Sequence, residues 1–493
     1  MADQPREVEL KLVLDPDAAG RLRAHPLFAG LEADPVDQRS TYFDTKGGLL
    51  RKAGFTLRVR TAHGRRVQTI KATGASAGLF DRPEWERVVD TEAPSLETLA
   101  GTPLEGLVPA KALARLKPRI VCTVRRTRWD LVQDGAEIEA VLDEGTVEAA
   151  GRVQPLCELE LELKSGSPDA LFAAARALAA DLPLHIGMLS KAEQGLALAD
   201  GSAGKVVKAE PLTLSPDMDA AAGFAAIVAA CLRHFRRNED LVCRARDAAA
   251  LHQARVAMRR LRSAFSLFAP VMRREGFAEL REELRWFTAS LGDARNLDVY
   301  LAGTELSGEA RAALVAAREQ AYDAVVAAAG SARFRRLMID LVAWSAVGPW
   351  RTRRRARAPL SRFAAARLDR LWEKVAARGA SLAELDEEAR HRLRIEVKKL
   401  RYAVEFVASL FADAPGRKRF RDALEALQES LGHLNDIATA RLLPERYGIA
   451  AAPPPADTEA EQARHLVESA AAFARLRRTG LFWHPRQGAH SPI

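Results

Sequence analysis

Residues 7–14 of the chain have the sequence Glu-Val-Glu-Leu-Lys-Leu-Val-Leu, in which charged and apolar side chains alternate before an apolar end. Successive side chains of a β-strand point to opposite faces, so Glu7, Glu9 and Lys11 share one face and the residues between them share the other. The segment is therefore predicted to be a strand with one ionic face and one apolar face.

The same alternation recurs through the first ~200 residues, which are predicted to be mainly short strands. Charges fall on one face at Arg58 and Arg60, at Glu84 and Glu86, at Arg126 and Arg128, at Glu137, Glu139 and Asp143, and at Glu158, Glu160 and Glu162. For one strand, a sheet with its polar face in water is the better explanation of the pattern. Six such strands with charges of both signs favour an antiparallel sheet closed around a polar cavity.

Charges of both signs on inward faces indicate phosphate chemistry. Arg and Lys bind phosphoryl oxygens, and groups of carboxylates hold Mg²⁺ or Mn²⁺, which prefer oxygen ligands. Together they suit the hydrolysis of a phosphoanhydride, in which metal ions and cations stabilise the developing charge. The sequence contains no GxxxxGK[ST] loop, so a P-loop mechanism is excluded.

The composition changes near residue 203. Residues 1–200 hold 26 Lys and Arg against 30 Asp and Glu, whereas the rest of the chain holds 48 against 35. Residues 203–218 have little to bury and are predicted to be a linker. Long Ala-, Leu- and Arg-rich stretches with helical periodicity follow it to about residue 478, which predicts helical bundles.

A pattern of one His and four cations occurs twice in the helical part. The copies are His252, Arg255, Arg259, Arg260 and Arg262, and His391, Arg394, Lys398, Lys399 and Arg401. Each copy is followed by Ser-Leu-Gly, at 290–292 and 430–432, so a helical unit has been duplicated. On a helix, the His and three of the cations share one narrow arc, where like charges repel. A multivalent anion would relieve that repulsion.

The basic half leaves the class of anion open between nucleic acid, an anionic membrane and another polyanion. The repeated face lacks aromatic side chains for stacking bases, apart from Tyr402 in one copy, which disfavours nucleic acid. Four cysteines without a CxxC pair, and a start without an apolar signal region, predict a reducing cytoplasm. No stretch approaches ~18 apolar residues, so no membrane span is expected.

The strand-rich half resembles the CYTH superfamily, the triphosphate tunnel metalloenzymes. The marks are Glu7-Val8-Glu9-Leu10-Lys11 (the ExExK signature), Tyr42-Phe43-Asp44-Thr45, Leu57-Arg58-Val59-Arg60, Lys71, Glu84-Trp85-Glu86, Arg126 and Arg128, Leu142-Asp143-Glu144-Gly145, Glu158-Leu159-Glu160-Leu161-Glu162 and Ser190-Lys191. The resemblance implies an eight-stranded antiparallel β-tunnel over residues 4–202 that cleaves a triphosphate with Mg²⁺ or Mn²⁺.

The same resemblance implies a role for individual residues of this chain. Catalysis would involve Glu7, Glu9, Lys11, Glu160 and Glu162, and metal ligands would come from Glu7, Glu9, Asp143, Glu158, Glu160 and Glu162. Substrate binding would involve Arg58, Arg60, Lys71, Glu84, Glu86, Arg126, Arg128 and Lys191. The family also contains adenylyl cyclases and thiamine triphosphatases, so the substrate stays open.

The duplicated helices resemble the CHAD domain, a conserved-histidine helical domain often fused to such tunnels. The resemblance implies an all-α domain over residues 219–480, with two pseudo-symmetric bundles at about 219–345 and 358–480. The ten residues of the duplicated pattern would then bind inorganic polyphosphate. We expect an α+β chain that acts as a cytoplasmic inorganic triphosphatase. The alternatives are a non-catalytic protein of polyphosphate granules and a tunnel enzyme for a nucleotide or thiamine triphosphate.

Overall fold

The computed structural model describes residues 6–72, 78–106, 109–273, 275–304, 306, 308–446 and 458–484. Packing divides the chain into two compact units. The tunnel unit comprises Met1–Val207, Val228–Ala245 and Ala327–Gly348, and the helical unit comprises Lys208–Ile227, Arg246–Val326 and Pro349–Ile493. Each unit is described by itself.

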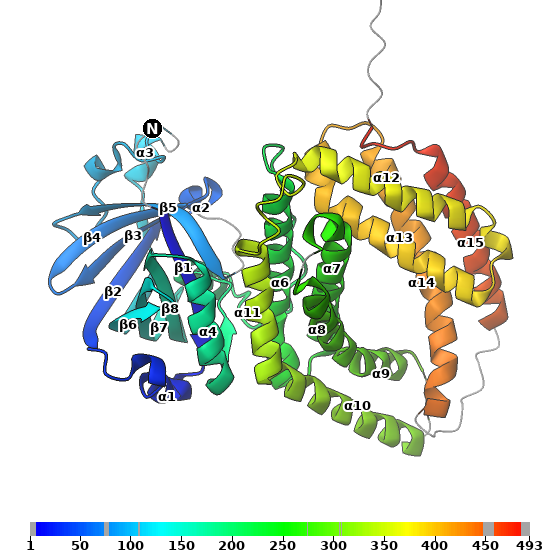
Figure 1. Ribbon diagram of the computed structural model, residues 1–493, viewed down its shortest axis with the longest axis horizontal. Coiled ribbons are helices and arrows are strands. Elements are labelled where there is room, and N and C mark those ends of the chain that lie inside the picture. Colours follow the sequence, from blue (N-terminus) through cyan, green and yellow to red (C-terminus); the bar gives the residue numbers. More distant parts are fainter. Residues whose placement is uncertain are drawn as a thin grey trace, which may run out of the picture. The chain divides into compact units, whose positions relative to one another are not determined.

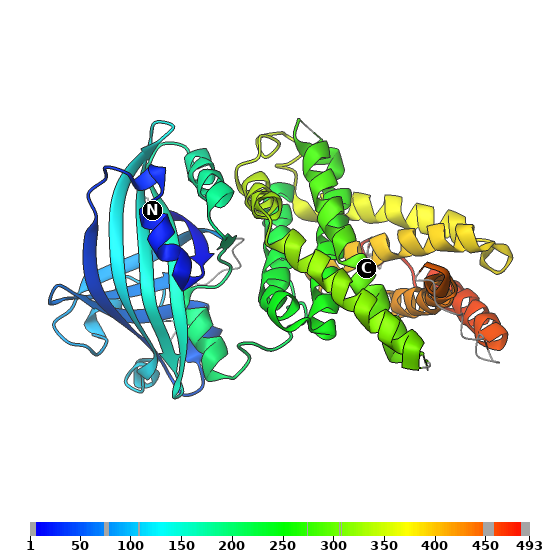
Figure 2. The ribbon, with the colours of Figure 1, turned by 90° about the horizontal axis from the view of Figure 1, so that it is seen from below.

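The tunnel unit is built on one curled antiparallel sheet (Figures 1 and 2). Its strands are β1 (Arg6–Leu14), β2 (Asp34–Asp44), β3 (Phe55–Ala62), β4 (Arg65–Ala72), β5 (Leu79–Val88), β6 (Lys117–Gln133), β7 (Ala136–Ala149), β8 (Arg152–Ser165) and β9 (Leu184–Ile186). The order is β5-β4-β3-β2-β6-β7-β8-β1-β9, and β5 also pairs with β1. The sheet therefore closes on itself, as predicted for the antiparallel tunnel.

Closure involves one strand more than the predicted eight among the described residues. The first part of β1 pairs with β5, with Glu9 opposite Phe80, and its last part pairs with β9, with Leu14 opposite Leu184. The short β9 thus continues the edge of β1 beyond the end of β5. Its three residues carry no alternation long enough to be found from the sequence.

The outer face of the sheet forms the apolar core of the tunnel unit. Leu10, Leu12, Leu159 and Leu161 are completely buried on β1 and β8. Helix α4 (Asp169–Asp181) packs against β1, β6 and β8, and α5 (Lys191–Ala199) packs against β6, β7 and β8. Because the helices cover the apolar face, the ionic face of each strand is left for the interior.

Helices make up the rest of the chain, as the composition predicted (Figure 1). Short helices are α1 (Ala19–Arg23), α2 (Leu49–Lys52) and α3 (Ala110–Leu113). The long ones are α6 (Ala220–Ala245), α7 (Ala248–Met272), α8 (Phe277–Ser290), α9 (Gly292–Gly303), α10 (Gly308–Ala329), α11 (Ala332–Ala346), α12 (Leu360–Gly379), α13 (Glu387–Val407), α14 (Arg417–Arg446) and α15 (Thr458–Arg478). None of the helices in the described part is both long and apolar enough to cross a membrane.

The duplicated pattern lies on α7 and α13. Each of these helices begins at an acidic N-cap, Asp247 or Asp386, which accepts a hydrogen bond from the backbone N–H three residues later. The Ser-Leu-Gly marks differ between the copies, because the first lies where α8 ends and α9 begins, whereas the second lies inside α14. The repeat is thus conserved in sequence more closely than in helix boundaries.

The predicted linker makes specific hydrogen bonds within both units. In the tunnel unit, Val207 N donates to Asn238 Oδ1 at 3.0 Å, and Asn238 Nδ2 donates to Val207 O at 2.9 Å. In the helical unit, Leu214 N donates to Ser409 Oγ at 2.8 Å. These bonds hold parts of the segment that the sequence suggested to be a free spacer.

A close strand contact at Gly145 gives a test of the sheet. A Cβ at this position would lie 2.0 Å from Thr123 O and 2.8 Å from Val124 Cα on β6, and a strand backbone cannot move aside cheaply. We expect Gly145→Ala to lower the free energy of unfolding by about 1–3 kcal/mol in chemical denaturation. Gly20→Ala, where a Cβ meets nothing within 4 Å, should change it by less than about 1 kcal/mol. Equal stability of the two variants would contradict the close contact.

Candidate functional site

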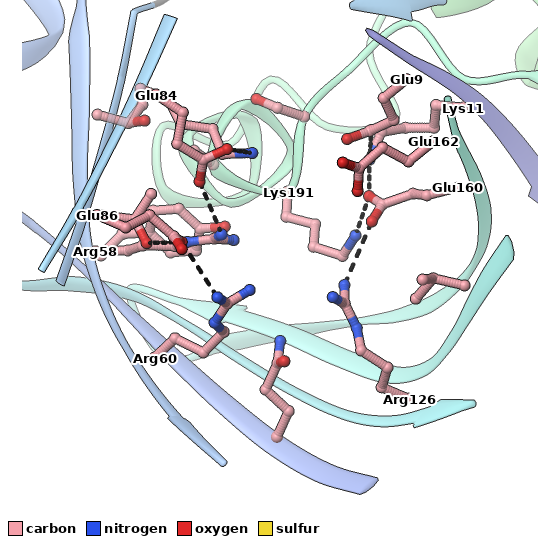
Figure 3. A pocket seen from close by; sticks show the side chains of 18 of the residues that line it. Glu9, Lys11, Arg58, Arg60, Glu84, Glu86, Arg126, Glu160, Glu162 and Lys191 are labelled. Atoms are coloured by element: carbon pink, nitrogen blue, oxygen red, sulfur yellow. Dashed lines mark hydrogen bonds and ion pairs between the residues drawn. The ribbon is translucent and has the colours of Figure 1, made fainter. Parts of the chain in front are cut away.

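A cavity of about 670 Å³ lies inside the curled sheet. Charged side chains from β1, β3, β4, β5, β6, β7, β8 and α5 line it. The predicted residues that line it are Glu9, Lys11, Arg58, Arg60, Lys71, Glu84, Glu86, Arg126, Glu160, Glu162 and Lys191. Figure 3 shows most of them pointing into the same space, with an acidic cluster on one side and an arginine-rich cluster on the other.

The acidic side of the cavity comes from β1 and β8, which pair antiparallel. Glu9 lies opposite Glu162, and Lys11 lies opposite Glu160. Residues opposite each other in a sheet point to the same face, so the pairing gathers three carboxylates and one ammonium group. The predicted ionic face of residues 7–11 is confirmed for Glu9 and Lys11, whereas the side chain of Glu7 lies outside the described residues.

Glu160 is the most strongly held carboxylate of the cavity. Its oxygens lie 2.5 Å from Lys11 Nζ, 2.6 Å from Lys191 Nζ and 3.3 Å from Arg126 Nη2 (Figure 3). Burial opposes its charge, but the three cations hold the pKa of Glu160 well below its usual range. Burial also opposes the charge of Lys11, yet Glu158 and Glu160 raise its pKa. Glu160 and Lys11 therefore both keep their charges.

Two of the predicted metal ligands lie beneath the cavity instead of lining it. Asp143 and Glu158 are 0 % and 1 % exposed. Asp143 accepts two hydrogen bonds of 2.7 Å from Arg126, and Glu158 lies 3.0 Å from Lys191 Nζ and 3.1 Å from Lys11 Nζ. In this arrangement they orient the cations that face the cavity.

The opposite side of the cavity is basic and comes from β3, β4 and β5. Lys71 Nζ lies 2.9 Å from Glu84, and Arg60 Nη2 lies 3.1 Å from Glu86. Arg58 Nη2 is 3.7 Å from Glu84. Thus Glu84 and Glu86 hold the cations in position on neighbouring strands, and their own oxygens are engaged by those cations.

Arg128 is the predicted tunnel residue that the structure places apart from the others. Its side chain is 47 % exposed and lies 3.3 Å from Glu139, and it is not among the residues that line the cavity. Conversely, Lys164 and Glu139 line the cavity and pair at 3.3 Å. Lys164 stands two residues after Glu162 on the same face of β8, so the alternation could have identified it.

The carboxylates that face the cavity fit a divalent metal by their chemistry. Glu9, Glu160 and Glu162 offer oxygen ligands of the kind that Mg²⁺ and Mn²⁺ prefer. Within the described residues, no three acidic, His or Cys side chains already form a metal-binding group. Glu160 already forms ion pairs with Lys11 and Lys191, and Glu162 forms one with Lys164, whose Nζ lies 2.7 Å away. A metal ion would therefore replace ammonium groups as the partner of these carboxylates.

A second cluster of charge lies in the helical unit, where cations of α7, α9 and α13 act on one another. We call it the basic groove and define it by Arg255 and Arg259 of α7, Arg295 of α9, and Arg394 and Lys398 of α13. Burial and the neighbouring Arg259, Arg295 and Arg394 lower the pKa of Arg255 to about 10. The predicted cationic faces of the two copies therefore face each other.

The groove continues into a cavity of about 310 Å³ between α7, α8 and α13. Its cationic lining residues are Arg259, Arg262, Arg281, Arg285, Lys398 and Lys399. Arg281 and Arg285 on α8 were not predicted, because they lie outside the repeated pattern. Their one-turn spacing on an amphipathic helix was the available signal.

The cations of the groove lack the counter-charges that the tunnel provides. Over the part of the chain that the structure describes, no ion pair joins Arg255, Arg259, Arg295 or Lys398 to a carboxylate, and Arg259 Nε is buried without a hydrogen-bond partner. Arg394 has Asp436 at 4.0 Å. Close, unneutralised cations repel one another, so this surface is poised for an anion.

The remaining members of the duplicated pattern are placed unequally. His391 Nδ1 lies 2.9 Å from Asn435 Oδ1, and His252 is half-buried on α7. Arg262 is exposed, while Arg401 stacks on the Tyr402 ring with its guanidinium 4.5 Å from the ring centroid. Lys399 pairs with Glu396 at 2.8 Å.

The prediction that Arg260 belongs to the anion-binding face is not supported by its position. Its side chain is 3 % exposed, its Nη2 lies 2.8 Å from Glu405, and its guanidinium lies 5.5 Å from the centroid of the Phe406 ring. The residue lies eight positions after His252, to the side of the arc that the other cations share. Arg260 therefore joins α7 to α13 in the core.

Comparisons with known proteins agree with the family resemblance expected for each half of the chain. Residues 5–196 match the CYTH domain, and residues 226–444 match the CHAD domain. An inorganic triphosphatase of Haemophilus influenzae is 30 % identical over 198 residues, which are 39 % of this chain and 55 % of that protein. The chain thus spans about half the length of this curated relative.

One similar solved structure is the CHAD domain of the plant Ricinus communis, which is 30 % identical. The match covers 56 % of this chain and 97 % of that chain, with a TM-score of 0.47. A candidate adenylyl cyclase from Hippeastrum, described as having a dominant triphosphatase activity, is 20 % identical; the match covers 40 % of this chain and 96 % of that chain, with a TM-score of 0.31. The two family matches show that the chain carries a CYTH domain in its first part and a CHAD domain in its second.

Proposed function

We propose that the protein is a metal-dependent inorganic triphosphatase whose helical domain binds inorganic polyphosphate. The observation that carries the proposal is the cavity of the tunnel unit, in which carboxylates and cations face each other across one enclosed space. The similarity to an inorganic triphosphatase supports it. Glu9 and Glu162 face the cavity in addition to the carboxylates that position its arginines, which favours hydrolysis over anion binding alone.

The charge balance of the cavity supports a need for metal. Among the described residues, eight cationic residues and six carboxylates line the cavity, and the buried Asp143 and Glu158 make the charges equal. A triphosphate carries several negative charges and would meet little net attraction in such a space. A divalent ion, when bound, would supply positive charge and activate or orient the attacking water.

The residues of the cavity divide the work accordingly. Glu9, Glu160 and Glu162, with Glu7, would hold the metal. Released from these carboxylates, Lys11 and Lys191 would bind phosphoryl oxygens together with Arg126. Arg58, Arg60 and Lys71 would bind the other end of the chain of phosphates. Fixed cations of this kind stabilise the charge that develops in phosphoryl transfer.

The groove supports the second half of the proposal. A flexible polyanion with one charge per phosphate needs closely spaced cations and no groups that recognise bases. Arg255, Arg259 and Lys398 provide such cations with no ion pair in the described part of the chain, and Arg394 has only Asp436 at 4.0 Å. Tethering to the tunnel would then raise the local concentration of phosphate chains.

A tunnel enzyme for a nucleotide or thiamine triphosphate is the second candidate, because the family includes such enzymes. The cavity offers two aromatic residues to a base. Tyr42 is 8 % exposed, and Trp85 packs against the apolar core that contains Leu57 and Ile70. Tyr42 is largely buried and Trp85 is held against the core, so the residues present favour the inorganic chain.

Loss of one carboxylate tests the tunnel. We expect Glu160→Gln to reduce phosphate release from tripolyphosphate with Mg²⁺ or Mn²⁺ by at least ~100-fold, because a fixed charge at the reacting centre is worth several kcal/mol. Glu7→Ala should have a similar effect. Glu148→Gln, which changes an exposed position of β7, should retain wild-type turnover. Wild-type turnover in Glu160→Gln would overturn the assignment of the site.

Substrate preference separates the candidates. Purified protein should show a higher kcat/KM for tripolyphosphate than for ATP or thiamine triphosphate, each measured with and without divalent metal. A preference for one of the organic triphosphates would favour the second candidate. Absence of hydrolysis for every substrate, with polyphosphate still bound, would favour the non-catalytic or granule-associated alternative.

Charge reversal separates the groove from the tunnel. Arg259→Glu combined with Lys398→Glu should abolish polyphosphate binding at moderate salt and leave tripolyphosphate hydrolysis within about twofold, because the two clusters belong to different units. The matched control is Lys374→Glu with Arg378→Glu, which reverses two exposed charges on α12. Loss of hydrolysis in the groove variant alone would show that the clusters are not separable.

A further inference from the structure

Lys398 differs from every other cation of the groove in being an amine. It is half-buried on α13, and the charges that act on it most strongly are the guanidinium groups of Arg394, Arg259 and Arg255. Asp436 on α14 is the carboxylate that opposes them. No ion pair of Lys398 is found in the described part of the chain.

The wider surroundings of Lys398 are also positive. Arg262 on α7, Arg281 and Arg285 on α8, and Lys399 on α13 line the same cavity, together with the Tyr402 ring. Arg285 is balanced by Glu282 at 2.7 Å, and Lys399 is balanced by Glu396 at 2.8 Å. The charge that remains around Lys398 is therefore mainly that of unpaired guanidinium groups.

Such a cluster can lower its repulsion by losing a proton only at the amine. A guanidinium group stays protonated at any ordinary pH, whereas an ammonium group in a half-buried, like-charged site releases its proton readily. Burial first, and then Arg394, Arg259 and Arg255, lower the pKa of Lys398 to about 7. Near neutral pH the empty groove then holds a substantial fraction of neutral Lys398.

We propose that Lys398 takes up a proton when a phosphate chain enters the groove, so that polyphosphate capture is coupled to proton binding. The inference rests on the proposed polyphosphate-binding function. Phosphate oxygens placed among the guanidinium groups reverse the local potential, and the protonated amine then donates hydrogen bonds to them. The neutral amine of the empty groove is ready to accept the proton without any change of fold.

The direction of the pH dependence follows from this coupling. Below pH 7, Lys398 is already charged in the empty groove and binding needs no additional proton. Above pH 7, Lys398 must take up a proton from solution each time a phosphate chain binds. The affinity for polyphosphate therefore falls by up to about tenfold for each pH unit, until the lysine of the complex itself loses its proton. Proton uptake should approach one per groove near pH 8.

Calorimetry in two phosphate-free buffers of different ionisation enthalpy measures this uptake directly, with the full chain and a linear polyphosphate of defined length. Because the ends of the phosphate chain also exchange protons, the decisive quantity is the difference between variants. Lys398→Arg keeps the charge and cannot release the proton, so it should lose about one proton of uptake at pH 8 and bind with little change from pH 7 to 8.5. Lys374→Arg, on the exposed face of α12, should behave as wild type.

Lys398→Gln provides a second test, since it should bind more weakly than wild type at pH 6, and the difference in affinity should narrow as the pH rises from 7 to 8.5. Equal proton uptake by wild type and Lys398→Arg, with both folded by circular dichroism, would overturn the coupling while leaving polyphosphate binding intact. Absence of polyphosphate binding by wild type at pH 6 and low salt would overturn the proposed ligand itself, and the coupling with it.

Discussion

The tunnel unit depends on the burial of charged groups that neutralise one another. Lys11, Lys191 and Arg126 converge on Glu160, while Asp143 and Glu158 hold the same cations from below. A buried charge without a partner costs several kcal/mol, so removal of one member leaves the others unbalanced. The closed sheet, its outer apolar face and the helices that cover this face all serve to keep these groups in one space.

The two clusters of charge in this chain follow opposite rules. In the tunnel, cations and carboxylates alternate and pair with one another without any ligand. In the groove, cations gather on facing helices with few carboxylates. Their mutual repulsion destabilises the protein when no anion is bound. The first arrangement suits exchange of an ammonium partner for a metal ion and a phosphate. The second suits retention of an anion along its length.

Sequence alternation predicted most of the tunnel, because every second residue of a strand must face the interior of a closed sheet. It could not separate Glu160 from Asp143 and Glu158, since all three occupy inward positions and depth depends on which cations reach over them. Helical spacing likewise predicted the facing cations of α7 and α13. It could not predict Arg281 and Arg285, which come from α8, nor the burial of Arg260, which depends on the partner helix.

Arg260 also bears on the history of the duplication. Its counterpart in the second copy, Lys399, remains at the edge of a solvent-accessible cavity, whereas Arg260 is committed to Glu405 and Phe406 of the opposite copy. In the first repeat, this cation is buried and joins α7 to the helix segment of the second repeat, whereas in the second repeat it stays at the surface. The two halves are no longer interchangeable, and neither would be expected to persist as an independent module or to form a symmetric pair with a copy of itself.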